Sequence, residues 1–396
     1  MLLNDGINDN HAAIQAMLDK GGIVMIDKPG KYLISKTLVI HSNTRFVLAP
    51  GAELIAAPMS RCALIENEHF RGGGKDKNIE IIGGTWDGNC DAQGYDSVEM
   101  AKHRLDHKVY DPDFFTGKLL RFCNLDNFCL EKLVVKDPVS YGIQIGVCYG
   151  FVVRDIVFDY NCNFGTTDGV HLQGDCYHGV IENLSGVTND DMVSLTPIDE
   201  CHAECCRGNI SDIVIRNICA RNGYSGVRLL ACGGCTTTNI LVSGVYGTYR
   251  HNAVLITNHH LEPGTRSYFD DITVEHVHAS KSPTPLRDDQ FIFWDGGIKC
   301  IERWPVVWVG YDIEIGKLTL RDITRHETAP TKAPFVYIGN SDVKIGRLYA
   351  DNIAQTLDEG IDAPAFVCEA TVGEMIMRDV ETSEITPEIR AMVDKY

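Results

Sequence analysis

Two short acidic motifs lie close together in the middle of the chain and offer carboxyl groups for chemistry. Asp168 lies within Thr166–Leu172, and Asp190 and Asp191 lie within Asn189–Leu195, so that Asp191 follows Asp168 by 23 positions. Each motif is an acidic corner that runs into a short alternating strand. If the two strands stack in register, the carboxylates become neighbours on one rigid face, which is an arrangement that glycosidic chemistry can use.

The carboxylates become neighbours only if the strands stack. A short sequence block that recurs along the chain predicts such stacking. From Ile23 onward, apolar residues recur with a period of two, and Gly, Asn and Pro separate short β-branched runs. The blocks begin at residues 78, 128, 151, 178, 213, 239, 271, 313 and 343. Spacing of this kind is typical of stacked solenoid coils, and a parallel β-helix fits it best.

A second column of strands can be aligned between these blocks, with apolar residues at its third and fifth positions. The first positions are Tyr141, Asp168, Asp191, Ser225 and Asn252. The fourth positions are Gln144, His171, Ser194, Arg228 and Leu255. Because side chains alternate along a strand, the fourth positions should form an outward ladder on one face. Polar and charged residues therefore gather on a few adjacent coils.

The expected fold is an all-β, right-handed, single-stranded parallel β-helix with an N-terminal capping helix. The helical signal is His11–Leu18, which follows Asn8–Asn10 as N-cap candidates. A single domain over residues 1–396 would comprise a cap over residues 1–22, coils over residues 23–380 and a C-terminal cap or tail over residues 381–396. Loop insertions interrupt the coils near residues 95–117, 197–208 and 259–267.

The charge balance of the chain argues against two classes of partner. With 36 Lys+Arg against 54 Asp+Glu, the formal net charge is -18, which repels nucleic acid and anionic membranes. No apolar run approaches the roughly 18 residues of a transmembrane helix. The first residues carry neither a basic nor an apolar signal region, so a cytoplasmic location is expected unless the chain has been trimmed.

The 15 cysteines are scattered through a long chain with a sizeable apolar core, so most are expected to be buried small side chains or free thiols. One group of four cysteines has two interpretations. The group Cys201, Cys205, Cys232 and Cys235 follows equivalent strands on adjacent coils and could meet at one corner to hold Zn²⁺. The alternative is two loops of unpaired thiols, and no cofactor is otherwise expected.

Several motifs of the sequence resemble those of a known family. Asp5–Gln15 followed by Gly21–Ile26 resembles the entry of pectin-lyase-like β-helix proteins. Gly84–Asn89 resembles an early coil of polygalacturonases, family 28 of the glycoside hydrolases. Thr167–Gly169 is similar to that family's Asn-Thr-Asp-Gly motif, and Asn189–Asp191 to its Gly-Asp-Asp motif. The resemblance implies that Asp168, Asp190 and Asp191 supply the general acid and the base, and that hydrolysis inverts the anomeric centre.

Two basic motifs of the family are not matched. Tyr224–Gly226 stands in place of Gly-His-Gly, and Arg228 occupies the strand position of the arginine in Arg-Ile-Lys, with Leu230 where the lysine belongs. Either one coil has been lost, or the site has been rebuilt with His171 and Arg228 as its basic groups. The full set of expected substrate-binding residues is His171, Arg228, Gln144, Ser225 and Tyr224.

The expected function is hydrolysis of a glycosidic bond in an oligosaccharide or polysaccharide, with a carbohydrate substrate and a homotrimer as a possible assembly. A lyase or fructotransferase-like enzyme on the same fold is the first alternative, in which His171 or Arg228 would serve proton abstraction or charge neutralisation. A non-catalytic carbohydrate-binding or structural β-helix is the second. In that case the aspartates only turn corners between strands, as aspartate commonly does.

Overall fold

The computed structural model describes residues 2–97, 117–198, 207–231, 234–258, 266–283, 304–340 and 342–393. They form two compact units, Met1–Asp190 with Asp199–Arg207 and Asp191–Ile198 with Gly208–Tyr396. Strands pair in parallel within each unit, which confirms the prediction of stacked coils. The boundaries of a single domain stay a prediction. Most of each predicted loop insertion lies outside the described residues, at 98–116, 199–206 and 259–265.

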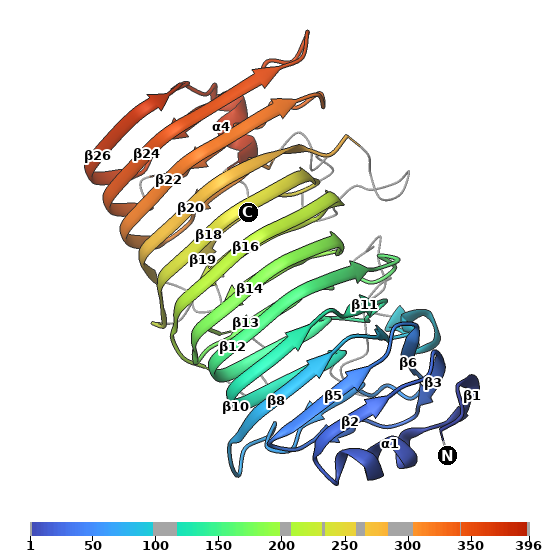
Figure 1. The fold of residues 1–396 in the computed structure, drawn as a ribbon. Helices are drawn as coiled ribbons and strands as arrows, with labels where there is room; N and C mark the ends of the chain where they lie inside the picture. The colour runs from blue at the N-terminus through green and yellow to red at the C-terminus, as the bar shows by residue number, and fades with distance from the viewer. Residues whose placement is uncertain are drawn as a thin grey trace. The chain divides into compact units, whose positions relative to one another are not determined.

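The strands of the first unit lie in three columns. The first column contains β2 (Gly22–Ile26), β5 (Thr44–Leu48), β8 (Asp76–Ile82), β10 (Leu120–Glu131), β12 (Ile143–Asp159) and β14 (Cys176–Val187). The second contains β1 (Asp5–Asp9), β3 (Gly30–Ile34), β6 (Ala52–Ala56), β9 (Thr85–Asp87) and β11 (Val134–Lys136), and continues into β12. The third contains β4 (Leu38–Ile40) and β7 (Ile65–Asn67), passes through β10 and β12, and ends at β13 (Val170–Gln173). Figure 1 shows β2, β5, β8 and β10 side by side.

Corners in the first column are turned by asparagines with left-handed backbone geometry. Asn43, Asn78 and Asn127 have φ of 61°, 54° and 58°, a region that asparagine tolerates better than most residues. Their side chains bond from coil to coil, with Nδ2–Oδ1 distances of 2.8 Å from Asn127 to Asn78 and from Asn78 to Asn43. The stacked amides satisfy one another and hold successive corners in register.

The predicted capping helix is confirmed as α1 (His11–Leu18), which buries Ile14 and Leu18. Among the N-cap candidates, Asp9 accepts a hydrogen bond from the backbone N–H of His11 at 3.0 Å. Asn10 immediately precedes the helix, but its side chain bonds to the backbone of Leu3 instead of capping the helix. The helix therefore begins where the sequence indicates, with the capping bond made one residue earlier.

The strands of the second unit lie in two described columns. The first contains β16 (Ile210–Gly223), β18 (Thr236–Tyr249), β20 (Ser267–Lys281), β22 (Ile313–Glu327), β24 (Lys344–Leu357) and β26 (Thr371–Val380). The second contains β15 (Asp191–Thr196), β17 (Ser225–Ala231), β19 (Val254–Asn258), β21 (Val307–Gly310), β23 (Val336–Ile338) and β25 (Phe366–Cys368).

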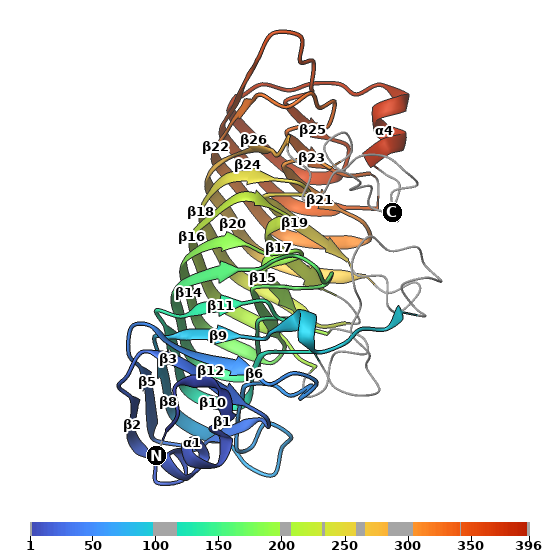
Figure 2. The ribbon, with the colours of Figure 1, turned by 90° about the vertical axis from the view of Figure 1, so that its right-hand side faces the viewer.

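The C-terminal tail of the second unit forms a helix, α4 (Pro387–Val393), as the sequence allows. Val393 is buried in an apolar cluster with Trp308 of β21, Tyr337 of β23 and Val367 of β25. Figure 2 shows α4 beside the β23 and β25 strands. Within the described ranges, no helix combines the length and the apolar character needed to cross a membrane.

Candidate active site

In the first unit, polar side chains gather at β12 and β13, the last two strands of the third column. Gln144 and His171 are register partners on β12 and β13, as the sequence alignment predicts. Asp168 lies just before β13, and its backbone oxygen accepts the N–H of Gly142 at 2.8 Å. Tyr141 therefore lies beside Asp168 on the preceding coil, which confirms the predicted row of first positions within this unit.

Asp168 and His171 form a short, buried pair. His171 Nδ1 lies 2.5 Å from Asp168 Oδ2, and both side chains are 4% exposed. Tyr141 stacks on the imidazole with ring centroids 4.0 Å apart and an angle of 4° between the planes. The carboxylate and the aromatic ring together fix the orientation of the imidazole. A carboxylate that binds Nδ1–H also selects the tautomer in which Nε2 is the basic nitrogen.

The corner that carries Asp168 is tied to the corner of the second acidic motif. Thr167 Oγ1 accepts the backbone N–H of Asn189 at 3.2 Å, and Asn189 Nδ2 donates to the backbone oxygen of Phe164 at 2.9 Å. The Tyr160 hydroxyl also donates to the backbone oxygen of Asp168 at 3.2 Å. These bonds explain the polar residues on either side of the acids, because they hold both corners in fixed geometry.

Asp190, which also belongs to the first unit, brings a second carboxyl group to this place. A carboxylate oxygen of Asp190 lies within 4.8 Å of one from Asp168. Asp190 is partly accessible, whereas Asp168 is buried. Two carboxylates at such a separation repel each other when both are ionised.

The fourth positions Gln144 and His171 are buried, which differs from the outward ladder expected from the sequence. Gln144 is fully buried, and its Nε2 donates to Oε1 of Gln173 at 2.9 Å. His171 is also buried. Strand alternation indicates which face a side chain takes, but it does not indicate what covers that face. Gln144 therefore supports its neighbours through hydrogen bonds instead of lining an open surface.

In the second unit, Asp191 and Arg228 form the corresponding acidic and basic pair. Asp191 is the register partner of Ser225, and Ser194 is the register partner of Arg228. Arg228 Nη1 lies 3.5 Å from Asp191 Oδ2, with the Arg228 side chain 16% exposed and that of Asp191 3% exposed. The contact is at the outer limit of a hydrogen bond, so its attraction is mainly Coulombic.

Ser225 and Tyr224 lie beside an aromatic and basic group that the sequence analysis missed. His251 stacks on Tyr224 with ring centroids 4.9 Å apart, and its Nδ1 lies 3.4 Å from Ser225 Oγ. Trp304 packs on His251 at a centroid distance of 4.1 Å, and the guanidinium of Arg250 lies 5.4 Å from the Tyr224 ring centroid. Extending the row of first positions back by one residue would have aligned Tyr224 with His251.

Lys118 was also missed, although the same alignment could have found it. The N–H of Leu119 bonds to the backbone oxygen of Tyr141 at 2.9 Å, which places Lys118 one coil before Tyr141. Lys118 is 2% exposed, and its Nζ lies 5.7 Å from the centroid of the Tyr141 ring. The buried row in the first unit is thus Lys118, Tyr141 and Asp168, with His171 stacked on Tyr141.

The possible zinc site cannot be placed, because Cys201, Cys205 and Cys232 lie outside the described residues. Cys235 is described and buried. No disulfide joins the cysteines in the described part of the chain, in agreement with the expectation of thiols. Burial raises the pKa of the Cys148 and Cys176 thiols well above its usual range, so these two are core side chains and not reactive thiolates.

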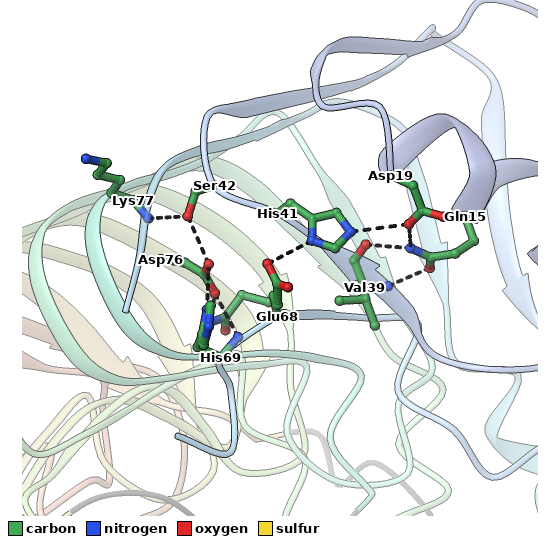
Figure 3. A network of polar contacts seen from close by, with 10 residues as sticks. Gln15, Asp19, Val39, His41, Ser42, Glu68, His69, Asp76 and Lys77 are labelled. Atoms are coloured by element: carbon green, nitrogen blue, oxygen red, sulfur yellow. Dashed lines mark hydrogen bonds and ion pairs between the residues drawn. The ribbon is translucent and has the colours of Figure 1, made fainter. Parts of the chain in front are cut away.

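A second group with metal-ligand chemistry, Glu68, His69 and Asp76, lies near the N-terminus of the first unit, with ligand atoms within 4.8 Å of one another (Figure 3). Asp76 accepts hydrogen bonds from Asn67 Nδ2 and the backbone N–H of His69, both at 2.8 Å, and from Ser42 Oγ at 2.9 Å. Its other close neighbour is His69 Nδ1 at 3.0 Å. These protein donors saturate the carboxylate, so Asp76 is explained as a structural bridge between coils.

No known protein family description matches the sequence, and no curated protein is similar to it. Solved structures do share the fold. A family 28 exopolygalacturonase from Yersinia enterocolitica has a TM-score of 0.57 at 16% identity, with 97% of this chain and 77% of that chain covered. A surface adhesin of Streptococcus pneumoniae has a TM-score of 0.55 at 13% identity, with 97% and 94% covered.

The A-module of a mannuronan C-5 epimerase from Azotobacter vinelandii is also similar, with a TM-score of 0.55 at 15% identity and 94% and 97% of the two chains covered. These structures confirm the right-handed, pectin-lyase-like parallel β-helix fold. A hydrolase, an adhesin and an epimerase share it, so the fold does not select a function. Function must be argued from the side chains of the site.

Proposed function

We propose that this protein is a glycoside hydrolase that cleaves a glycosidic bond in an oligosaccharide or polysaccharide, with Asp168, Asp190 and Asp191 as its carboxyl groups. The observation that carries the proposal is the close approach of Asp168 and Asp190, within 4.8 Å, beside the oriented imidazole of His171. Hydrolysis of a glycoside needs one protonated and one ionised carboxyl group. Crowded carboxylates supply that difference because they do not ionise together.

Asp168 is proposed as the ionised partner, since Nδ1–H of His171 donates to its carboxylate at 2.5 Å. As the base, Asp168 takes a proton from water while the water oxygen bonds to the anomeric carbon. A protonated carboxyl from the consecutive pair Asp190 and Asp191 gives its proton to the leaving oxygen, and the glycosidic C–O bond breaks. Attack by water in one step inverts the anomeric centre, which is the outcome that the resemblance to family 28 implies. The carboxylate separation within 4.8 Å is shorter than the roughly 6.5–9.5 Å typical of inverting enzymes, so inversion rests on the resemblance and not on this distance.

Substrate contact is proposed for Arg228 and Tyr224 in the second unit, which are partly accessible, whereas Ser225 between them in the chain is 1% exposed. The Arg228 side chain is 16% exposed and carries a planar guanidinium fork, which suits sugar hydroxyls or a carboxylate. The Tyr224 ring, stacked on His251, offers the flat apolar face that sugar rings pack against. His171, Gln144 and Ser225 are all buried and are assigned to positioning, the first two around Asp168 and Ser225 beside His251.

A lyase is the second candidate, because Lys118, Tyr141 and His171 line up beside Asp168 in the first unit. In that reaction His171 takes a proton from the carbon next to a uronic carboxylate. The electrons of that C–H bond form a C=C double bond, the glycosidic C–O bond breaks, and the leaving oxygen takes a proton from water. A lysine near the uronic carboxylate of the substrate neutralises the negative charge that develops on it when the proton is removed. The buried ammonium of Lys118 fits that requirement.

The two reactions give different products from the same incubation. Purified protein is incubated with a panel of neutral and uronic oligosaccharides, and both new reducing ends and the ultraviolet absorbance of an unsaturated product are followed. A hydrolase yields reducing ends without absorbance, and a lyase yields both. Retention of a glycan on the protein without turnover would overturn both proposals and favour a binding role.

The carboxyl assignment is tested on whichever glycan is turned over. Asp168→Asn, Asp190→Asn and Asp191→Asn should each abolish most turnover while leaving the far-ultraviolet circular dichroism unchanged. Asp159→Asn is the matched control, because Asp159 is an exposed aspartate at the end of β12. If Asp191→Asn or Asp168→Asn turns over substrate as fast as the control, these carboxyl groups are not the catalytic centre.

A further inference from the structure

The strand β26 ends the first column of the second unit and leaves an edge open. It pairs in parallel with β24 from Thr371, opposite Lys344, to Val380, opposite Ile353. No other described strand pairs with it, and Figure 1 shows β26 at the end of its column, beside β24. An open edge presents unpaired N–H and C=O groups that can accept another strand.

Apolar side chains accompany this open edge. Met375 and Met377 are register partners of Leu348 and Ala350, which are both fully buried in β24. In β26 the two methionines are each 42% exposed, and Ile376 between them is 37% exposed. The apolar interior of the coils thus continues to the last strand, where nothing among the described residues covers it. Covering these side chains would remove apolar surface from water.

The order of residues along this edge is self-complementary. The segment Glu374-Met375-Ile376-Met377-Arg378 reads as acid, apolar, apolar, apolar and base. When two copies run antiparallel with Ile376 opposite Ile376, each Met375 faces Met377 and each Glu374 faces Arg378. Opposite charges and apolar pairs across two strands both stabilise a sheet. The complementary charges occur twice in this arrangement, because the pairing is two-fold symmetric.

We propose that Glu374–Arg378 pairs antiparallel with the same segment of a second copy of this chain and forms a two-fold symmetric dimer. A parallel arrangement of the same edge places Glu374 beside Glu374 and Arg378 beside Arg378, which is repulsive. The two-fold arrangement also closes the edge after two copies, whereas an edge that accepted strands indefinitely would form fibres. A dimer, and not the trimer considered from the sequence, fits this surface.

The charged residues are available for the new pairs. Glu374 Oε2 lies 2.7 Å from Arg347 Nε on the neighbouring strand, but the two side chains are 50% and 58% exposed. Exposed ion pairs of this kind hold their partners weakly, so Glu374 can turn toward Arg378 of the partner subunit. The interface is short compared with stable complexes that bury roughly 1,600 Å². The dimer is therefore expected to dissociate on dilution.

The test is sedimentation velocity of the full chain across a dilution series, with each variant checked by circular dichroism. Glu374→Arg and Arg378→Glu, made singly, each place like charges opposite one another twice and should weaken dimerisation by about tenfold or more. The double variant restores opposite charges and should recover dimerisation. Glu384→Arg is the control, since it makes the same charge change at an exposed residue outside the edge.

Two results would overturn the proposal. One is a wild-type protein that remains a monomer at the highest concentration in the series, because the edge would then be covered by something other than a second copy. The other is a double variant that dimerises no better than the single variants, since any dimer would then use a different surface. Neither result depends on whether the protein acts on a glycan.

Discussion

The acidic corners of the two units are held by different basic groups and at different distances. In the first unit, the imidazole of His171 lies 2.5 Å from Asp168 beneath the stacked ring of Tyr141. In the second, the guanidinium of Arg228 lies 3.5 Å from Asp191, and the arginine side chain retains 16% exposure. The first pair is fixed before any ligand arrives, and the second can adjust. Fixed groups suit bond making and breaking, whereas an adjustable cation suits recognition.

The largest effect should come from neutralising the fixed carboxylate. Asp168→Asn keeps the size of the side chain and removes its charge, so it removes the base and weakens its hold on Nδ1 of His171. We expect kcat to fall by about 10²–10⁴-fold, the range for loss of a positioned acid or base. The measurement is turnover of an identified glycan against the Asp159→Asn control. A changed KM with an unchanged kcat would contradict the catalytic role of the fixed pair.

A comparable effect, on stability, should follow from breaking a buried pair in the second unit. Arg325 and Glu327 are both fully buried, with Arg325 Nη1 3.5 Å from Glu327 Oε2. Burial lowers the pKa of Arg325 to about 10, and the charge of Glu327 opposes that shift. Arg325→Ala leaves the carboxylate buried without its cation, which should lower the free energy of unfolding by about 3–5 kcal/mol.

Denaturant unfolding measures this loss. Lys317→Ala is the control on the same strand, β22, because Lys317 and Asp271 form an exposed ion pair, with side chains 48% and 51% exposed. Exposed pairs contribute little, so the control should unfold close to the wild type. If both variants lose the same free energy of unfolding, burial does not determine how much an ion pair contributes to stability.

A smaller effect is expected from the adjustable cation of the second unit. Arg228→Lys keeps the charge but loses the planar fork that binds two oxygens at once. We expect KM for the glycan to rise about tenfold with a smaller change in kcat, as for the loss of a charged hydrogen bond to substrate. Arg221→Lys, at an exposed arginine, is the control. A kcat that collapses with KM unchanged would place Arg228 among the catalytic groups instead.

The smallest effect should be a pH dependence that belongs to the first unit. His41 lies between Glu68, 2.9 Å from its Nδ1, and Asp19, 3.2 Å from its Nε2 (Figure 3). Burial lowers the pKa of His41, but the hydrogen bonds to both carboxylates outweigh burial and raise it above 6.5. The stabilisation is thus fully present below the unfolded pKa of about 6.5 and is lost as pH rises through the folded pKa.

Thermal unfolding from mildly acidic to mildly alkaline pH checks this prediction. The melting temperature of the wild type should approach that of His41→Ala as pH rises, because both proteins then lack the charged bridge. His326→Ala is the control in the second unit, at an exposed histidine 2.9 Å from Asp358. A constant difference between wild type and His41→Ala at every pH would show that packing, and not charge, is what His41 contributes.

The sequence by itself determined the coils and the row of polar positions within each unit. Strand alternation and repeat spacing are local properties, and so they predicted the register partners Gln144 with His171 and Asp191 with Ser225. The start of α1 and the helical tail also followed from local signals. Extending the row of first positions to the preceding coil would have found Lys118, and extending it back by one residue would have found His251.

Only the tertiary structure decided what these positions do. It buried Gln144, set His171 on Asp168 through Nδ1 and left Arg228 at a longer distance from Asp191. It also exposed Met375 and Met377, which have the pattern of core residues but lie on the last strand. The physical reason is that alternation fixes the direction of a side chain, whereas burial and hydrogen bonding depend on what the neighbouring coils place against it.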